Sequence, residues 1–147
     1  MIIDESIVIQ APLDTVWKTF TDIACWADWN TVMEDVPAGR EAMEKGAPLE
    51  FCIRPFLFPV RLEPVIEEVV RNEKVTWSGT KFGISSRHEF FFEKSGVGVR
   101  VRSRESFTGG PLEAMSFAFP ERRIREMTQA LLRDLKKAAE GRHHGKD

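Results

Sequence analysis

The sequence predicts an α+β fold, in which a curved antiparallel sheet of about six to seven strands wraps around one long C-terminal helix. Three observations lead to this prediction. Residues 120–140 carry apolar side chains at helical spacing, residues 48–107 contain alternating polar and apolar segments between short turns, and two short helical segments follow the first strand. A helix with one apolar face needs an apolar surface to cover it, and the sheet supplies that surface. We expect a single domain over residues 1–141 and a polar tail over residues 142–147.

The first strand and the two short helices occupy residues 2–30. Residues 2–10 have the composition of a strand, but their apolar positions do not alternate cleanly enough to assign an inner face. Ala11-Pro12 ends the strand and opens a helix, since proline suits the first helical turn. A second helical turn covers residues 23–30. The apolar stripe of the first helix has the spacing i, i+3, i+4, i+7 and consists of Leu13, Val16, Trp17 and Phe20.

The remaining strands are predicted between residues 31 and 107. Pro64 interrupts a long strand and marks a bulge or an edge, because proline lacks the backbone N–H that a sheet ladder uses. Ser95-Gly96 is the predicted two-residue turn of the last hairpin. The predicted strands cover residues 31–36, 48–54, 60–71, 74–80, 84–93 and 97–107.

The long C-terminal helix is predicted from Pro120 to Glu140, with Gly141 as its stop. Basic residues around Gly141 suit the negative end of the helix dipole. A helix of this length spans roughly 30 Å, so it organises the rest of the chain around it. Its apolar face is formed by Ile124, Met127, Thr128, Leu131, Leu132, Leu135, Ala138 and Ala139.

The composition argues against several classes of protein. A formal net charge of -2 argues against a general nucleic-acid-binding protein. No run of about 18 apolar residues is present, so stable membrane insertion is not expected. Met1 leads directly into a strand pattern, which predicts the absence of a signal peptide. Cys25 and Cys52 lack metal-ligand spacing, and we interpret them as reduced cysteines of a cytoplasmic protein.

The last predicted hairpin places a histidine and a glutamate on one face of the sheet. With a turn at Ser95-Gly96, His88 pairs with Ser103, and His88 and Glu105 become diagonal neighbours on two strands. The face that they share is otherwise apolar and therefore points inward. An imidazole beside a carboxylate in an apolar cavity can act as a general acid–base pair. The alternative is a structural hydrogen bond, or an anchor for the polar group of a ligand.

Four stretches of the chain, taken together, carry a family resemblance. They are residues 9–12 with Val16-Trp17, residues 26–30 (Trp-Ala-Asp-Trp-Asn), residues 87–90 with 105–109, and residues 130–136. In this order they resemble the START/birch-pollen-allergen-like helix-grip superfamily (SRPBCC), and within it the bacterial polyketide cyclase/dehydrase and lipid-transport group. Members of this superfamily bind sterols, lipids, hormones or polyketides, cyclise aromatic precursors, or assist other proteins. The resemblance therefore implies the helix-grip fold more specifically than it implies a function. It also places His88 and Glu105 at the family's characteristic pair of positions.

The apolar side chains between sheet and helix form either a filled core or the lining of a pocket for a flat or aliphatic ligand. The resemblance favours a pocket, because a helix held by a curved sheet leaves space at one end. The candidate catalytic residues are His88 and Glu105. The candidate ligand-binding residues are Trp29, Phe51, Trp77, His88, Phe90, Phe92, Phe107, Met127 and Leu131.

Three functions stay open. The first is binding or transport of a small hydrophobic ligand (a lipid, polyketide or aromatic compound) in an internal cavity. The second is a polyketide cyclase/dehydratase-type enzyme, with His88 as acid–base catalyst and Glu105 as its partner. The third is a protein-interaction module that acts through the apolar tip Phe56-Leu57-Phe58 or through the outer strand. The same tip is equally compatible with a portal lid, a dimer contact, a membrane-touching loop or a loop folded over the core.

No cofactor is predicted. The sequence has no Gly-rich phosphate loop, no clustered metal ligands, and no apparent Ser/His/Asp or Cys/His set. We therefore expect neither a metal nor a nucleotide. The sequence determines neither the identity of the ligand nor the oligomeric state, a homodimer included.

Overall fold

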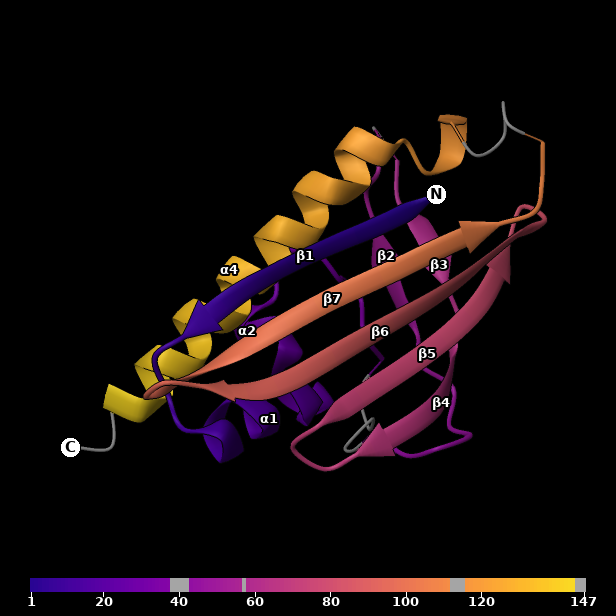
Figure 1. Cartoon of the computed structure of the whole chain (residues 1–147). Coiled ribbons are helices and arrows are strands. Elements are labelled where there is room, and N and C mark those ends of the chain that lie inside the picture. The colour runs from indigo at the N-terminus through magenta and orange to yellow at the C-terminus, as the bar shows by residue number, and fades with distance from the viewer. Residues whose placement is uncertain (38–42, 57, 112–115, 145–147) are drawn as a thin grey trace.

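The computed structural model describes residues 1–37, 43–56, 58–111 and 116–144. Figure 1 shows a broad sheet with the helices and a small second sheet behind it. The elements run in the order β1 (Ile2–Ile9), α1 (Leu13–Thr21), the 3-10 turn η1 (Ile23–Cys25), α2 (Trp26–Trp29), β2 (Phe51–Ile53), β3 (Val60–Leu62), β4 (Val65–Val70), β5 (Lys74–Lys81), β6 (Ile84–Ser95), β7 (Gly98–Thr108) and α4 (Glu121–His144).

The large sheet has five antiparallel strands in the order β1-β7-β6-β5-β4, and β2 and β3 form a separate two-stranded sheet. The first strand therefore lies beside the last one, and α4 runs along β1 (Figure 1). This arrangement confirms the predicted α+β class, the curved antiparallel sheet and the two short helices after the first strand. It divides the seven strands between two sheets, which the sequence analysis did not separate.

The strands predicted at residues 31–36 and 60–71 differ from those in the structure. Residues 31–36 do not form a strand, and Glu34 makes only an isolated bridge to Cys52. The reason lies in Asn30, whose side-chain oxygen accepts hydrogen bonds from the backbone N–H groups of Val32 and Met33 and so holds a turn. The break at Pro64 is confirmed, since β3 ends at Leu62 and β4 begins at Val65.

The predicted apolar face of α4 is confirmed, but the predicted stop is wrong. Seven of its eight residues are buried, and Ala138 is half-buried. The helix continues through Gly141 to His144. Arg142 fixes this last turn, because its guanidinium donates to the Thr19 hydroxyl at 3.3 Å and lies 3.9 Å from the Asp22 carboxylate. The start of residues 142–147 is therefore helix docked on α1, whereas residues 145–147 lie outside the described residues.

The register of the β6–β7 hairpin differs from the prediction by two residues. The turn residues are Gly96 and Val97, between the paired Ser95 and Gly98. Gly96 has φ +61°, and Val97 does not have a positive φ, which is the pattern of a type II′ turn with glycine in first place. A shift of two residues keeps every side chain on its predicted face. It makes His88 and Glu105 direct partners instead of diagonal neighbours.

An aromatic cluster around Phe20 fills the core where α1 meets the sheet. The Phe20 ring lies 4.6 Å from Phe90, 5.4 Å from Phe92 and 6.1 Å from Trp77, between ring centroids. Trp26 completes the cluster and donates its indole N–H to the Phe20 carbonyl oxygen at 2.8 Å. This end of the interface is therefore solid.

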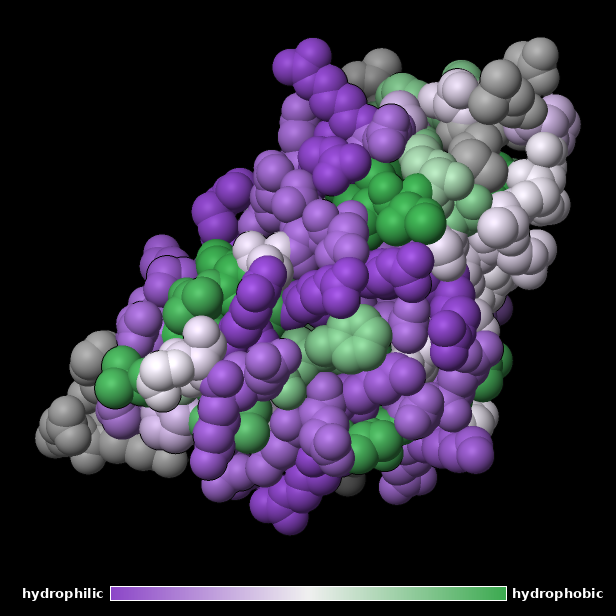
Figure 2. Space-filling model, in the orientation of Figure 1, coloured by the Kyte–Doolittle hydropathy of each residue, from purple (hydrophilic) through white to green (hydrophobic). Residues whose placement is uncertain are grey.

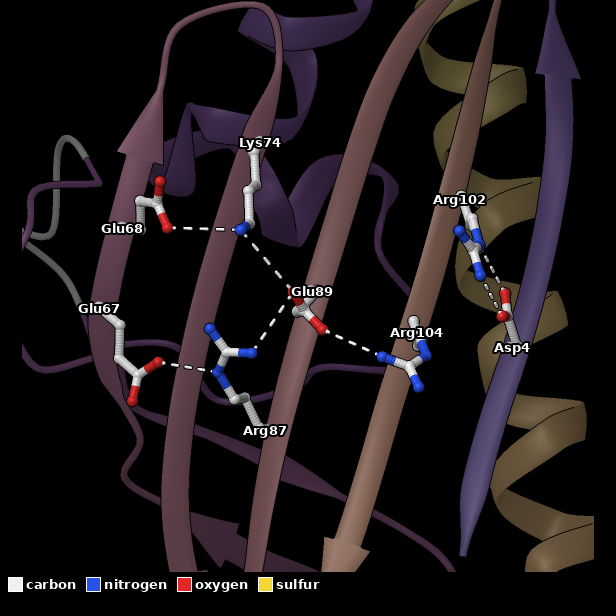
Figure 3. Close-up of polar contacts among 8 residues, drawn as sticks. All are labelled: Asp4, Glu67, Glu68, Lys74, Arg87, Glu89, Arg102 and Arg104. Carbon is white, nitrogen blue, oxygen red and sulfur yellow. Dashed lines mark hydrogen bonds and ion pairs between the residues drawn. The ribbon is translucent and has the colours of Figure 1, made fainter.

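The outer face of the large sheet is hydrophilic (Figure 2). Figure 3 shows that ion pairs connect neighbouring strands on this face. Glu89 of β6 lies 3.8 Å from Lys74, 3.5 Å from Arg87 and 3.7 Å from Arg104, and its side chain is only 12% exposed. Arg102 forms a two-pronged pair with Asp4 on β1. The basic residues of this face are thus balanced by acidic ones, as predicted for a solvated surface.

Candidate functional site

A cavity of about 80 Å³ lies between the large sheet, the small sheet and α4. It lies beyond the Phe20 cluster, at the other end of the interface between the large sheet and the helices. Its walls are mainly apolar, because inward-facing positions of the strands alternate with outward polar ones. Seven predicted residues line it, namely Phe51, Trp77, His88, Glu105, Phe107, Met127 and Leu131.

The other predicted ligand-binding residues lie elsewhere. Phe90 and Phe92 belong to the solid Phe20 cluster. Trp29 is half-buried beside the core and does not line the cavity. Phe90 and Phe92 share the inner face of β6 with the lining residue His88, so the two-residue periodicity of a strand could not separate core from cavity.

The structure adds lining residues that the sequence analysis did not select. Several come from loops and from the small sheet, whose position no local pattern predicted. The apolar ones are Val32, Met33, Ile53, Leu62, Pro64, Ile84, Phe119 and Ile124, and the uncharged polar ones are Thr80, Ser86 and Thr128. The hydroxyl of Thr128 donates to the Ile124 carbonyl oxygen at 2.9 Å, so it is already engaged within α4.

His88 is held by contacts on every side of its ring. Its Nε2 lies 2.6 Å from the hydroxyl oxygen of Ser103, and its Nδ1 lies 3.4 Å from Oε2 of Glu105. The ring stacks on Phe90 at 4.1 Å and meets the edge of Trp77 at 5.5 Å, between centroids. Burial among these groups lowers the pKa of His88 to about 3, so the imidazole is neutral at pH 7.

Glu105 is the acidic group of the cavity wall. Its side chain is 17% exposed, and it lines the cavity. Burial raises the pKa of Glu105 to about 8, so its carboxyl group is protonated at pH 7. Among the residues that the structure describes, none hydrogen-bonds its second oxygen, Oε1. One carboxyl oxygen is therefore available to a molecule in the cavity.

The protons of neutral His88 and neutral Glu105 can be placed in two ways. In the first, the Glu105 carboxyl O–H donates to Nδ1, and His88 Nε2–H donates to Ser103. In the second, the Ser103 O–H donates to Nε2, His88 Nδ1–H donates to Oε2, and the Glu105 proton sits on Oε1. The carboxyl group can therefore present either an acceptor or a donor to the cavity, with no net charge in the pair.

Ser103 corrects the sequence analysis, which found no Ser/His/acid set. The three side chains lie in a line, because a two-residue shift of register brings Glu105 opposite His88. Ser103 is hydrogen-bonded to Nε2 of His88, and Oε2 of Glu105 lies 3.4 Å from Nδ1. Ser103 is fully buried and does not line the cavity. A nucleophile must reach its substrate, so Ser103 positions the His88 ring and is not a nucleophile of this cavity.

The predicted tip is only partly described. Phe56 and Phe58 are 41% and 51% exposed, and Leu57 lies outside the described residues. The Phe56 ring lies 5.4 Å from that of Phe117, which is itself 65% exposed. The two exposed rings therefore cover each other in part, and the role of the tip stays a prediction.

The described ranges contain no group of three or more His, Cys, Asp or Glu side chains placed to hold a metal ion. Within the same ranges, every helix is too short or too polar to cross a membrane.

Solved structures resemble this chain over nearly its whole length. The solution structure of the KanY protein (ms6282) has a TM-score of 0.76 at 16% identity and covers 96% of this chain and 98% of its own. A START superfamily protein from Mycobacterium smegmatis has a TM-score of 0.67 at 12% identity and covers 99% of both chains. DynU16, a putative protein in the dynemicin biosynthetic locus, has a TM-score of 0.72 at 13% identity over 97% of this chain and 48% of its own.

At these identities the likeness shows the fold, which is START-like. A comparison with curated protein sequences finds no match. A family profile, in contrast, matches almost every residue, from 2 to 140. The chain therefore belongs to the family described as polyketide cyclase / dehydrase and lipid transport.

Proposed function

We propose that this protein binds a small hydrophobic molecule in the cavity between the sheet and α4, with His88 and Glu105 holding the polar group of that molecule. The observation that carries the proposal is the composition of the cavity wall. Most of its lining side chains are apolar, and two titratable groups that are largely buried in it, the His88 imidazole and the Glu105 carboxyl group, lie next to each other. An apolar pocket with a few convergent polar groups is the usual form of a small-molecule site. Membership of the family supports a ligand-binding or polyketide-related role.

The size of the cavity limits the ligand. At about 80 Å³ it is small beside the roughly 300–1,000 Å³ typical of sites for drug-sized molecules. Phe51, Trp77 and Phe107 take up much of the space that the curved sheet encloses. Met127 is the adaptable part of the wall, since an unbranched thioether repacks at low cost. We therefore expect a compact ligand, such as one ring or a short chain.

Native mass spectrometry of protein purified from its source host tests this proposal. A co-purifying apolar compound at a one-to-one ratio, released on denaturation, is the expected result. A matched pair of variants locates the compound. Leu131→Trp fills the cavity and should abolish binding, whereas Lys137→Trp adds the same side chain to an exposed position of α4 and should not. A ligand-free mass, with no thermal shift across a panel of lipids and aromatic polyketides, would contradict the proposal.

A second candidate function, acid–base catalysis of a cyclisation or dehydration, is supported by one specific observation. Glu105 is a neutral acid with a pKa of about 8, and it is connected to Ser103 through the His88 ring. A group with a pKa near neutrality is suited to give and take a proton in such reactions. Under this hypothesis, His88→Ala and Glu105→Gln abolish product formation from poly-β-ketone substrates while ligand binding persists. A pure binding protein would form no product with or without these substitutions.

A further inference from the structure

The inner end of the cavity contains no cation in the part of the chain that the structure describes. Its charged lining residues are Glu63, Lys81 and Glu105. The Glu63 side chain is 65% exposed, which places it at the mouth. Lys81 ends β5, and its ammonium lies 5.6 Å from the ring centroid of Phe82, a turn residue that is 56% exposed. Within the described ranges, Glu105 is therefore the one ionisable acid at the inner wall, and Nδ1 of His88 lies 3.4 Å from its Oε2.

Other charged groups near this wall are already engaged. Glu5, on the inward face of β1, pairs with Arg125 of α4 at 3.4 Å and accepts from Gln129 at 2.9 Å. Arg125 also pairs with Glu121 at 3.5 Å. These groups satisfy one another at the edge between β1 and α4, so none of them supplies a counter-charge to a ligand inside the cavity.

We propose, on the basis of the function proposed above, that the cavity selects an uncharged ligand with a hydroxyl or carbonyl oxygen, which hydrogen-bonds to the free oxygen of Glu105. A hydroxyl can accept from or donate to this carboxyl group, and a carbonyl accepts from it. The Ser103–His88 contact allows both roles, because the Ser103 hydroxyl can donate to or accept from Nε2 and His88 can therefore carry its proton on either nitrogen. The Glu105 carboxyl group then carries its proton either on Oε2, facing His88, or on Oε1, facing the ligand. The apolar wall excludes the water that would otherwise compete for this bond.

The same geometry discriminates against ions of equal size. A carboxylate would lose its hydration and would meet another acid instead of a cation. An ammonium ion could pair with Glu105 only if the carboxyl group ionised inside an apolar cavity, and burial opposes this ionisation because it raises the pKa of Glu105. Both ions therefore bind more weakly than the neutral alcohol.

Four one-ring compounds test the proposal, namely toluene, benzyl alcohol, benzoate and benzylammonium. Binding is followed at pH 6.5 by NMR titration of the methyl groups of Met127 and Leu131, which line the cavity. We expect benzyl alcohol to bind at least tenfold more tightly than either ion and several-fold more tightly than toluene. Glu105→Gln, which keeps a neutral polar group of the same size, should preserve this order. Glu105→Leu should remove the advantage of the alcohol over toluene.

The outcomes separate this inference from the proposed function. If toluene binds as tightly as benzyl alcohol, or benzoate binds as tightly as the alcohol, the selectivity is overturned while the cavity function stands. Retention of the alcohol preference by Glu105→Leu would also overturn it, because the bond to Glu105 would then be unnecessary. If none of the four compounds shifts the two methyl groups, the cavity function itself fails, and this inference fails with it.

Discussion

His88 and Glu105 are direct cross-strand partners on β6 and β7, with Nδ1 of the imidazole 3.4 Å from Oε2 of the carboxyl group. Burial acts on both in the direction of neutrality, lowering the pKa of His88 to about 3 and raising that of Glu105 to about 8. Neither group therefore needs the other as a counter-ion. Their pairing is a close contact between two neutral polar groups in a mainly apolar wall, and it sets the chemistry of the cavity.

The first prediction concerns the pH dependence of the free energy of unfolding. From pH 3 to 4.5 stability rises, because the unfolded chain protonates His88 and the folded chain does not. From 4.5 to 6.5 the two groups oppose each other, since folded Glu105 binds the proton that the unfolded carboxylate lacks. From 6.5 to 8 only Glu105 acts, and stability falls by at most about 1.4 kcal/mol per pH unit.

Urea denaturation at a series of pH values checks this profile in the wild type and in the Glu105→Gln variant. Glu105→Gln is neutral at every pH and should remove the fall above pH 6.5. Its stability should rise up to pH 6.5 and then stay level. A wild-type stability that stays level between pH 6.5 and 8, like that of the variant, would indicate an ionised Glu105 in the folded protein, contrary to the neutral pair.

The second prediction concerns Ser103 as the residue that positions His88. Ser103→Ala removes the 2.6 Å bond to Nε2 and leaves a buried ring nitrogen unsatisfied, which should destabilise the fold by about 1–3 kcal/mol. It should also change the tautomer populations of His88, measured by its ring ¹⁵N chemical shifts. Ser106→Ala is the matched control on β7, because the Ser106 hydroxyl makes no hydrogen bond within the described residues. Unchanged His88 shifts in Ser103→Ala would refute the positioning role.

Much of this site was predictable because strand periodicity is robust. The inward placement of His88 and Glu105 survived a register error, since an error of two residues leaves every side chain on its face. The periodicity could not predict that His88 and Glu105 pair directly across the two strands. That depends on whether the hairpin turn begins at Ser95 or at Gly96, and both are compatible with a glycine-containing two-residue turn.

The fold was predictable for a similar reason, and its errors have local causes. The apolar stripe of α4 defines the buried face without knowledge of the sheet, whereas the end of the helix depends on a contact between distant residues, Arg142 with Thr19 and Asp22. The cavity itself was the least predictable feature. Phe90 and Phe107 are both inward aromatic residues, but only the three-dimensional position of Phe20 determines which of them packs in the solid core.

The third prediction concerns the ion pairs of the outer face. Glu89 is largely covered and faces Lys74, Arg87 and Arg104, so Glu89→Gln leaves three cations without their shared partner. We expect a loss of about 1–2 kcal/mol at low ionic strength and less in 1 M salt, where such interactions are screened. Glu93→Gln is the control, an exposed position on the same face of β6 without an ion pair in the described chain. An equal effect of both substitutions, measured by thermal unfolding, would show that Glu89 has no special role.

The fourth prediction concerns Gly141, which lies inside α4 although glycine disfavours helices. Apart from the neighbouring residues and the backbone of α4 itself, no atom lies within 4 Å of a Cβ added there. Gly141→Ala should therefore stabilise the protein by about 0.5–1 kcal/mol through the lower entropy of the unfolded chain. Gly98→Ala is the opposing control, because its Cβ would lie 2.5 Å from the carbonyl oxygen of Ile9 and force β1 away from β7. Urea denaturation should therefore give opposite signs for the two substitutions. A destabilised Gly141→Ala variant would mean that the helix does end near Gly141 in solution, as its sequence suggests.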